Sequence, residues 1–122
     1  MSRVTHFEIS ANEPEKVIGF YKTVFGWKIT KWEGPIEYWM VSTGDPETPG
    51  IDGGIFRPGE LFSGTVNTVE VDDIDAAVEK VIENGGQLVV EKNAIPGIGY
   101  QAYCKDVEGS IFGVHQDDPQ AA

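Results

Sequence analysis

Two histidines are the residues of this chain best suited to bind a ligand or to move a proton near neutral pH. His6 begins the stretch 6–10, where polar and apolar residues alternate as in a β-strand. Because strand side chains alternate between two faces, His6 and Glu8 share one face. His115 lies in a second predicted strand, residues 110–116. The sequence therefore predicts two strand faces with histidines that can line a ligand cavity.

Aromatic residues form a second group of candidate contacts. Trp39 lies in the predicted strand 37–43 and Phe56 in the predicted strand 51–58, while Tyr103 belongs to a later strand. Aromatic faces favour flat apolar or cationic groups. We expect Trp39 and Phe56 to line the same curled face as the first histidine. The facing depends on strand register, since a slip of one residue reverses every side chain.

The elements that carry these residues occur twice. A shift of sixty positions places Ala11–Gly26 on Val71–Gly86 without a gap. In each copy a strand is followed by a predicted helix cap, Asn12 or Asp72, then by an apolar helical stripe and a closing glycine. Three further strands follow in each half, so each half reads β-α-β-β-β. Such a repeat indicates two copies of one unit, neither of which could bury its apolar face alone.

We therefore predict an α+β fold in which two βαβββ units form a curled, mixed eight-stranded sheet with two outer helices. The chain of 122 residues is interpreted as one domain, with units 1–58 and 65–116. The pair Gly53-Gly54 suggests a bulge, or close approach by another backbone or a ligand. The tail 116–122 has little to pack and is expected to fray.

Composition excludes several classes of partner. The net charge is −11, from nine Lys and Arg against twenty Asp and Glu, whereas a nucleic-acid-binding protein needs a basic footprint. The same sign disfavours anionic membrane surfaces, and no apolar run approaches the roughly 18 residues of a membrane span. The N-terminus has no signal-peptide core. Cys104 is the single cysteine, so no intrachain disulfide can form and we expect a reduced, cytoplasmic setting.

Taken together, these patterns resemble the vicinal oxygen chelate superfamily, which includes glyoxalase I, bleomycin resistance proteins and extradiol dioxygenases. The resemblance covers about the whole chain and rests on the duplicated unit and on motifs in both halves. The motifs are His6-Phe7-Glu8-Ile9, Pro14-Glu15-Lys16, Phe20-Tyr21, Phe25-Gly26-Trp27, Val69–Ala77, Gly85-Gly86 and Asp106–Ser110. In the last of these, Val107 and Ser110 stand where the family has proline and asparagine. The resemblance implies a small-molecule cavity, often across a dimer, and we expect a homodimer.

The resemblance also implies where a metal would bind. Metal enzymes of the family use four ligands, one on the first strand, one at the end of the first unit, one on the first strand of the second unit and one on the last strand. His6 matches the first position, whereas Val66 and Gly113 fall on the last two and offer no donor atom. Asp52 is the one oxygen donor near the remaining position. We therefore predict no metal site, with His6 and Asp52 as weak candidates, and a divalent metal held by displaced ligands such as His115 as the alternative.

Three functions remain open. The favoured hypothesis is a metal-independent small-molecule-binding protein, as in antibiotic sequestration. The second is a divalent-metal-dependent lyase or dioxygenase that uses displaced ligands, and the third is a non-catalytic interaction domain. No catalytic residue is identified. The acidic face and the overall charge favour a neutral or cationic, partly aromatic ligand. The predicted contacts are His6, Glu8, Trp39, Phe56, Tyr103 and His115.

Overall fold

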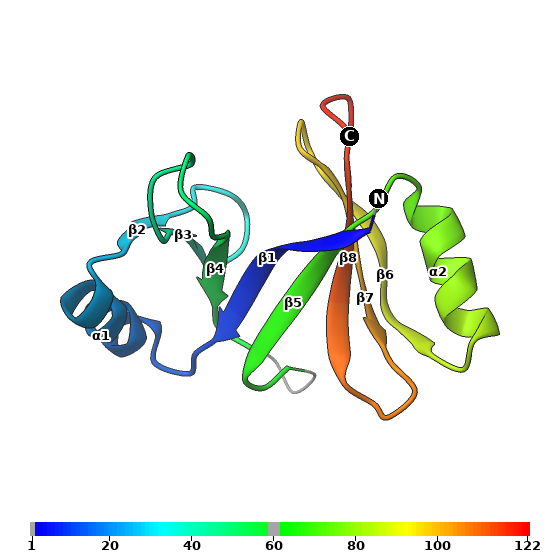
Figure 1. Cartoon of the computed structure of the whole chain (residues 1–122), viewed down its shortest axis with the longest axis horizontal. Helices are drawn as coiled ribbons and strands as arrows, with labels where there is room; N and C mark the ends of the chain where they lie inside the picture. Colours follow the sequence, from blue (N-terminus) through cyan, green and yellow to red (C-terminus); the bar gives the residue numbers. More distant parts are fainter. Residues whose placement is uncertain (1, 59–61) are drawn as a thin grey trace. The chain divides into compact units, whose positions relative to one another are not determined.

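The computed structural model describes residues 2–58 and 62–122, which divide into two compact units (Figure 1). The N-terminal unit is His6–Val66, and the C-terminal unit is Asn67–Ala122 together with the start of the chain up to Thr5. The order β-α-β-β-β occurs twice along the chain. The predicted α+β class, with two βαβββ repeats that supply eight strands and two helices, is confirmed.

The N-terminal repeat supplies β1 (Arg3–Ser10), α1 (Pro14–Phe25), β2 (Lys28–Lys31), β3 (Tyr38–Ser42) and β4 (Asp52–Phe56). Its strands lie in the order β2-β3-β4-β1, with β1 parallel to β4 and the other pairs antiparallel. The helix covers one face of this sheet with its predicted apolar stripe. The core beneath α1 contains Ala11, Ile29, Val41 and Ile55, with Phe7, Ile9, Val17, Ile18, Tyr21, Trp27 and Trp39 packed against them.

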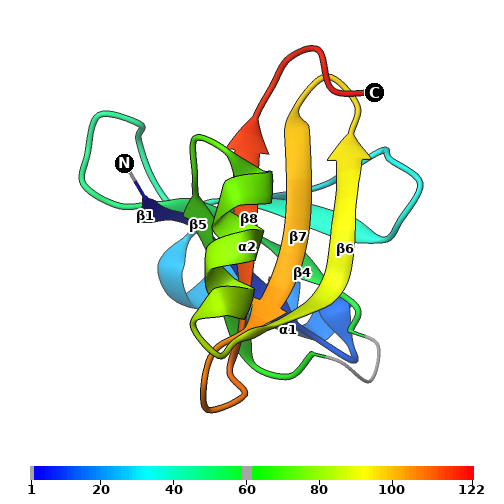
Figure 2. The same ribbon diagram turned by 90° about the vertical axis from the view of Figure 1, so that its right-hand side faces the viewer.

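The C-terminal repeat supplies β5 (Thr65–Glu70), α2 (Ile74–Glu83), β6 (Gln87–Ile95), β7 (Gly99–Lys105) and β8 (Ile111–Asp117). Its strands lie in the order β5-β8-β7-β6, with β5 parallel to β8, and α2 lies along one face of this sheet (Figure 2). Neither helix in the described part of the chain is long and apolar enough to span a membrane. The core beneath α2 contains Val71, Ile74, Ala102, Cys104 and Val114.

Both helices begin one residue later than the sequence pattern suggested. The N-cap of α1 is Glu13, which makes no side-chain capping hydrogen bond, and Pro14 follows it in the first helical turn. The N-cap of α2 is Asp73, whose carboxylate accepts a hydrogen bond from the backbone N–H of Ala76 at 3.1 Å. The predicted glycine stop of α1 is confirmed, since Gly26 has a left-handed φ of 71°.

The C-terminal tail is ordered, which corrects the expected fraying. Strand β8 continues to Asp117, and the turn after it is held to the β6–β7 connection by backbone hydrogen bonds. The N–H of Asp118 donates to the carbonyl of Ile98, and the N–H of Gly97 donates to the carbonyl of Ala121, each at 2.9 Å. Ala121 is only 5% exposed. The tail therefore has a packing partner that composition alone did not reveal.

Candidate functional site

In the N-terminal unit, the sheet face turned away from α1 gathers polar and aromatic side chains. The pairing of β1 with β4 sets Glu8 opposite Gly54, with His6 two residues before it on the same face. The pairing of β3 with β4 sets Tyr38 opposite Phe56 on that face. Glu8 is only 6% exposed, so a carboxylate is held within this surface. We call His6, Glu8, Tyr38 and Phe56 the N-terminal polar face.

A hydrogen bond on this face connects β1 with β3. The His6 Nε2 atom lies 2.8 Å from the hydroxyl of Tyr38. The phenol ring lies over Gly54, where a Cβ atom would overlap the hydroxyl. On the opposite face, Gly53 is covered in the same way by the ring of Phe7. The predicted close approach at the glycine pair therefore comes from two aromatic side chains, and Gly54 is the residue that lets Tyr38 reach His6.

Trp39 lies on the other face of the same sheet, which corrects its expected facing. It is paired with Ile55 across β3 and β4 and packs in the core beneath α1. The ammonium nitrogen of Lys31 lies 6.0 Å from the centroid of its ring. The register therefore separates Trp39 from His6 and Glu8, and the neighbouring Tyr38 takes the place on the polar face.

Asp52 is paired with His6 across β1 and β4, but its carboxylate is engaged elsewhere. The Oδ1 atom accepts hydrogen bonds from the backbone N–H of Thr43 at 2.9 Å and from the Thr43 hydroxyl at 3.4 Å. These contacts fix Asp52 to the end of β3. Within the described ranges, no group of three metal-ligating side chains contains His6 or Asp52.

In the C-terminal unit, the face turned away from α2 is polar around Gly113. The pairing of β5 with β8 sets Thr68 opposite Gly113, and the pairing of β7 with β8 sets Tyr103 opposite Gly113. A Cβ atom at Gly113 would lie 2.7 Å from the Thr68 hydroxyl and 2.9 Å from the Gln101 amide nitrogen. Thr68 is 2% exposed, and its hydroxyl has no hydrogen-bond partner among residues 2–58 and 62–122. The side chains of Thr68 and Gln101 thus occupy the space that a side chain at position 113 would need.

His115 lies on the same face as Gly113 and contacts two carboxylates. Its Nδ1 atom lies 3.1 Å from Glu70 Oε1 and 3.4 Å from Asp117 Oδ1. The second oxygen of Glu70 accepts a hydrogen bond from the backbone N–H of Asp117 at 3.0 Å. Nδ1 is thus the ring nitrogen of His115 that faces both carboxylates. We call Glu70, His115 and Asp117 the C-terminal carboxylate–histidine cluster.

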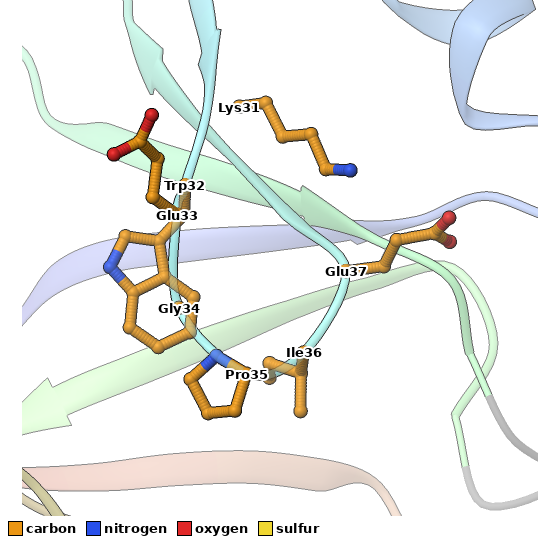
Figure 3. A pocket seen from close by; sticks show the side chains of 7 residues that line it. All are labelled: Lys31, Trp32, Glu33, Gly34, Pro35, Ile36 and Glu37. Carbon is orange, nitrogen blue, oxygen red and sulfur yellow. The ribbon is translucent and has the colours of Figure 1, made fainter.

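A hollow of about 490 Å³ lies in the loop between β2 and β3 (Figure 3). Its seven lining residues are consecutive, from Lys31 to Glu37, so the hollow is formed by the course of one loop. The indole ring of Trp32 lies over Gly34 and meets the ring of Tyr38 edge-on, at 6.3 Å between centroids. The sequence pattern predicts a strand up to Glu33, a turn at Gly34-Pro35 and a second strand from Glu37, and it does not indicate a hollow here. The structure places it next to an aromatic residue of the N-terminal polar face.

Cys104 lies in the core beneath α2 and is fully buried. Burial raises the pKa of its thiol, because the charged thiolate is disfavoured away from water. A nucleophilic cysteine needs a thiolate and access to solvent. Cys104 is therefore a packing residue rather than a nucleophile.

Comparison with known proteins identifies relatives across nearly the whole chain. The model of the Glyoxalase/Bleomycin resistance protein/Dioxygenase superfamily matches residues 3–114. Two proteins named "Putative glyoxylase CFP32", from Mycobacterium bovis and Mycobacterium tuberculosis, are 31% identical over 119 residues, which are 93% of this chain. The match covers 43% of the length of each relative, so the chain spans less than half of these proteins.

Solved structures share the fold at lower sequence identity. Hypothetical protein BH1468 from Bacillus halodurans C-125 has a TM-score of 0.72 at 16% identity, with 99% of this chain and 98% of that chain covered. A methylmalonyl-CoA epimerase from Mycobacterium tuberculosis has a TM-score of 0.69 at 16% identity, with 95% and 88% covered. At such identities the likeness extends to the fold alone.

Proposed function

The chain belongs to the glyoxalase/bleomycin resistance protein/dioxygenase superfamily, and from this premise we propose that it is a small-molecule-binding protein that works without the family's usual metal site. The observation that supports this most directly is the N-terminal polar face. It combines a buried carboxylate, a histidine–tyrosine hydrogen bond and an aromatic ring on one side of one sheet. Polar groups that converge beside aromatic surface are typical of sites for small ligands.

The residues present do not fit the four-ligand metal site that the resemblance implies. Val66 is buried and has no donor atom, and Gly113 has no side chain. The space in front of Gly113 is flanked by Thr68 and Gln101, so a glutamate there would need both to move. Asp52, the remaining oxygen donor, is bonded to Thr43. We therefore assign no step of the function to a metal at these positions.

The chemistry of the N-terminal polar face favours an uncharged or cationic ligand that carries an aromatic ring. Glu8 places a carboxylate in a largely buried position, and a second negative charge beside it would raise the free energy of the complex. The net charge of −11 opposes the approach of anions. Phe56 and Tyr38 offer ring surface to a flat group, and the Tyr38 hydroxyl can accept or donate a hydrogen bond.

Two substitutions on this face should weaken binding of the preferred ligands. The experiment is a tryptophan-fluorescence quenching screen over charge-matched aromatic compounds, from which cationic and neutral hits are expected. Glu8→Gln should reduce the preference for cations, because it removes the carboxylate. Tyr38→Phe should weaken the hits about three- to tenfold, because it removes the hydroxyl that positions His6 and that can hydrogen-bond the ligand, a contact of about 1 kcal/mol.

Trp39→Phe is the matched control, because Trp39 lies on the opposite face of the same strand. It should leave the relative affinities of the hits unchanged, and intrinsic fluorescence from the other two tryptophans remains available. The N-terminal polar face is not the binding site if anionic compounds bind most tightly to the parent protein. The same conclusion follows if neither Glu8→Gln nor Tyr38→Phe changes the affinities of the hits.

A second candidate function is a glyoxalase-like lyase. It is favoured by the name of the two mycobacterial relatives at 31% identity. Turnover of the methylglyoxal–glutathione adduct by purified protein, abolished when the protein is dialysed against chelator, would support this function over simple binding. A chain that binds neither metal nor small molecule would instead support a non-catalytic interaction domain.

The partner that we propose for this chain is a second copy of itself, as a homodimer in the cytoplasm. The curated relatives are more than twice as long as the segment they share with this chain. The resemblance to the superfamily implies a cavity that is often shared across a dimer, and a second copy would complete it. Light scattering coupled to size exclusion should give twice the mass of 13.3 kDa at micromolar concentration. The mass of one chain across that concentration range would exclude the dimer.

A further inference from the structure

We propose that the C-terminal carboxylate–histidine cluster, Glu70, His115 and Asp117, is a divalent-cation site distinct from the four ligand positions of the family. Glu70 lies four residues after Val66, and His115 lies two residues after Gly113. The cluster therefore lies beside two positions that carry no donor atom, on the same strands, β5 and β8.

The spacing of the three groups suits one metal ion. Bonds of about 2.0–2.2 Å from a metal to nitrogen and oxygen place neighbouring ligand atoms about 3.0–3.5 Å apart. His115 Nδ1 lies 3.1 Å from Glu70 Oε1 and 3.4 Å from Asp117 Oδ1. One ligand atom from each residue lies within 4.8 Å of the other two. Small side-chain rotations would close the set around a single ion.

The backbone holds two of these ligands in place. The pairing of β5 with β8 sets Glu70 directly opposite His115. Glu70 Oε2 accepts the N–H of Asp117 at 3.0 Å, which leaves Oε1 to face the imidazole. Metal-ligating carboxylates commonly keep such a hydrogen bond through their second oxygen. The structure therefore contains both the ligand atom and the contact that orients it.

The imidazole ring is also fixed by its neighbour. The ring lies against Gly99, where a Cβ atom would come within 3.0 Å of Cε1 and Nε2. The side chain of His115 is only 14% exposed, so few rotamers are open to it. A ligand that is held by packing loses little conformational freedom when a metal binds.

Charge gives an independent reason for a cation at this place. Glu70 and Asp117 bring two carboxylates together in a chain of net charge −11. Lys16, Arg57 and Lys92 form their ion pairs with Glu13, Glu37 and Asp75, which lie outside the cluster. A bound cation would relieve the repulsion between these two carboxylates.

One imidazole nitrogen and two carboxylate oxygens suit Zn²⁺, Ni²⁺, Co²⁺ or Mn²⁺ better than Cu⁺, which prefers sulfur. Three protein ligands leave coordination positions for water or for a small molecule. The side chain of Asp117 is 79% exposed, so these positions face solvent. The site would therefore bind metal reversibly and would release it on dialysis against a chelator.

The test is a titration of the purified chain with Co²⁺, followed by the visible absorption of the bound ion and by calorimetry. One equivalent per chain is expected. His115→Gln and Glu70→Gln should each weaken binding about tenfold or more, because a ligand is lost. The side chain of Asp117 is exposed, so Asp117→Asn should fold like the parent protein. The loss of metal affinity can therefore be measured in this variant without misfolding. Its affinity should fall in the same direction.

His6→Gln is the matched control, since His6 is the other histidine of the chain and belongs to the N-terminal polar face. Cobalt affinity should stay unchanged in this variant. Absence of saturable binding in the parent protein would overturn the proposal. Binding that survives all three cluster substitutions, or that is lost in His6→Gln, would place the metal elsewhere and would also overturn it.

Discussion

Replacing Gly53 by alanine should lower the free energy of unfolding by about 1–3 kcal/mol, the usual cost of overpacking a filled interior. A Cβ atom at Gly53 would overlap both the backbone carbonyl oxygen and the ring of Phe7. The ring could rotate, but the carbonyl belongs to β1 and is fixed by its pairing with β4. Urea denaturation followed by circular dichroism measures the change.

Gly54→Ala has a different expected result, because the atoms in its way are the far end of the Tyr38 side chain. That ring can swing aside at a smaller cost in stability, but the hydrogen bond from Tyr38 to His6 would be lost. The variant should therefore fold and should bind the ligands of the N-terminal polar face as weakly as Tyr38→Phe.

Gly44→Ala is the control for both substitutions. A Cβ atom there would meet only the Thr48 hydroxyl, at 3.6 Å, which is an ordinary contact. Its free energy of unfolding should stay within about 0.5 kcal/mol of the parent protein, as for most surface substitutions. Equal stability of Gly53→Ala and Gly44→Ala would contradict the packing that places Phe7 over β4.

The repeat made the fold predictable from sequence. The helix and its closing glycine occur twice in the same phase, over sixteen positions from Ala11 to Gly26 and from Val71 to Gly86. The assignment of secondary structure in one copy therefore supports the assignment in the other. Each apolar stripe predicted the face that a helix buries, as Val17 and Val78 show. The sequence did not fix the N-cap of α1, because Asn12 and Glu13 are both polar residues that precede Pro14. The structure places the N-cap at Glu13.

The candidate site depended on register, which the sequence does not encode locally. Tyr38 and Trp39 are adjacent aromatic residues on one strand, and one of them must face α1. Alternation alone cannot decide which, whereas pairing with Phe56 and Ile55 does. The signal that could have decided it is Gly54, because a glycine leaves room for a ring on the face opposite the helix.

The carboxylate–histidine cluster escaped sequence reasoning for a different reason. Glu70 and His115 are 45 positions apart and meet only because β5 runs parallel to β8. The family's ligand positions fall on Val66 and Gly113, and the sequence offers His115 as a displaced ligand without indicating its carboxylate partners. The structure shows that neighbouring positions on the same strand faces carry donors instead.

Truncation of Ile74 to alanine should cost about 2–5 kcal/mol, the range for removing a large buried aliphatic side chain. Ile74 is the first residue of α2 and is 1% exposed, in the core with Val71 and Val114. The loss leaves a cavity at the point where the helix meets β8. Thermal and urea unfolding of the variant should both report the change.

Ile82→Ala on the same helix is the matched control, since Ile82 is 54% exposed and alanine is the stronger helix former. It should change the free energy of unfolding by less than about 0.5 kcal/mol.

Ile74 is also connected to the C-terminal carboxylate–histidine cluster, because the side-chain oxygen of Gln116 accepts a hydrogen bond from the N–H of Ile74 at 2.9 Å. Gln116 follows His115 on β8, so loosening α2 at Ile74 should also reduce cobalt affinity at the cluster. An Ile74→Ala variant as stable as Ile82→Ala would show that α2 does not anchor this strand.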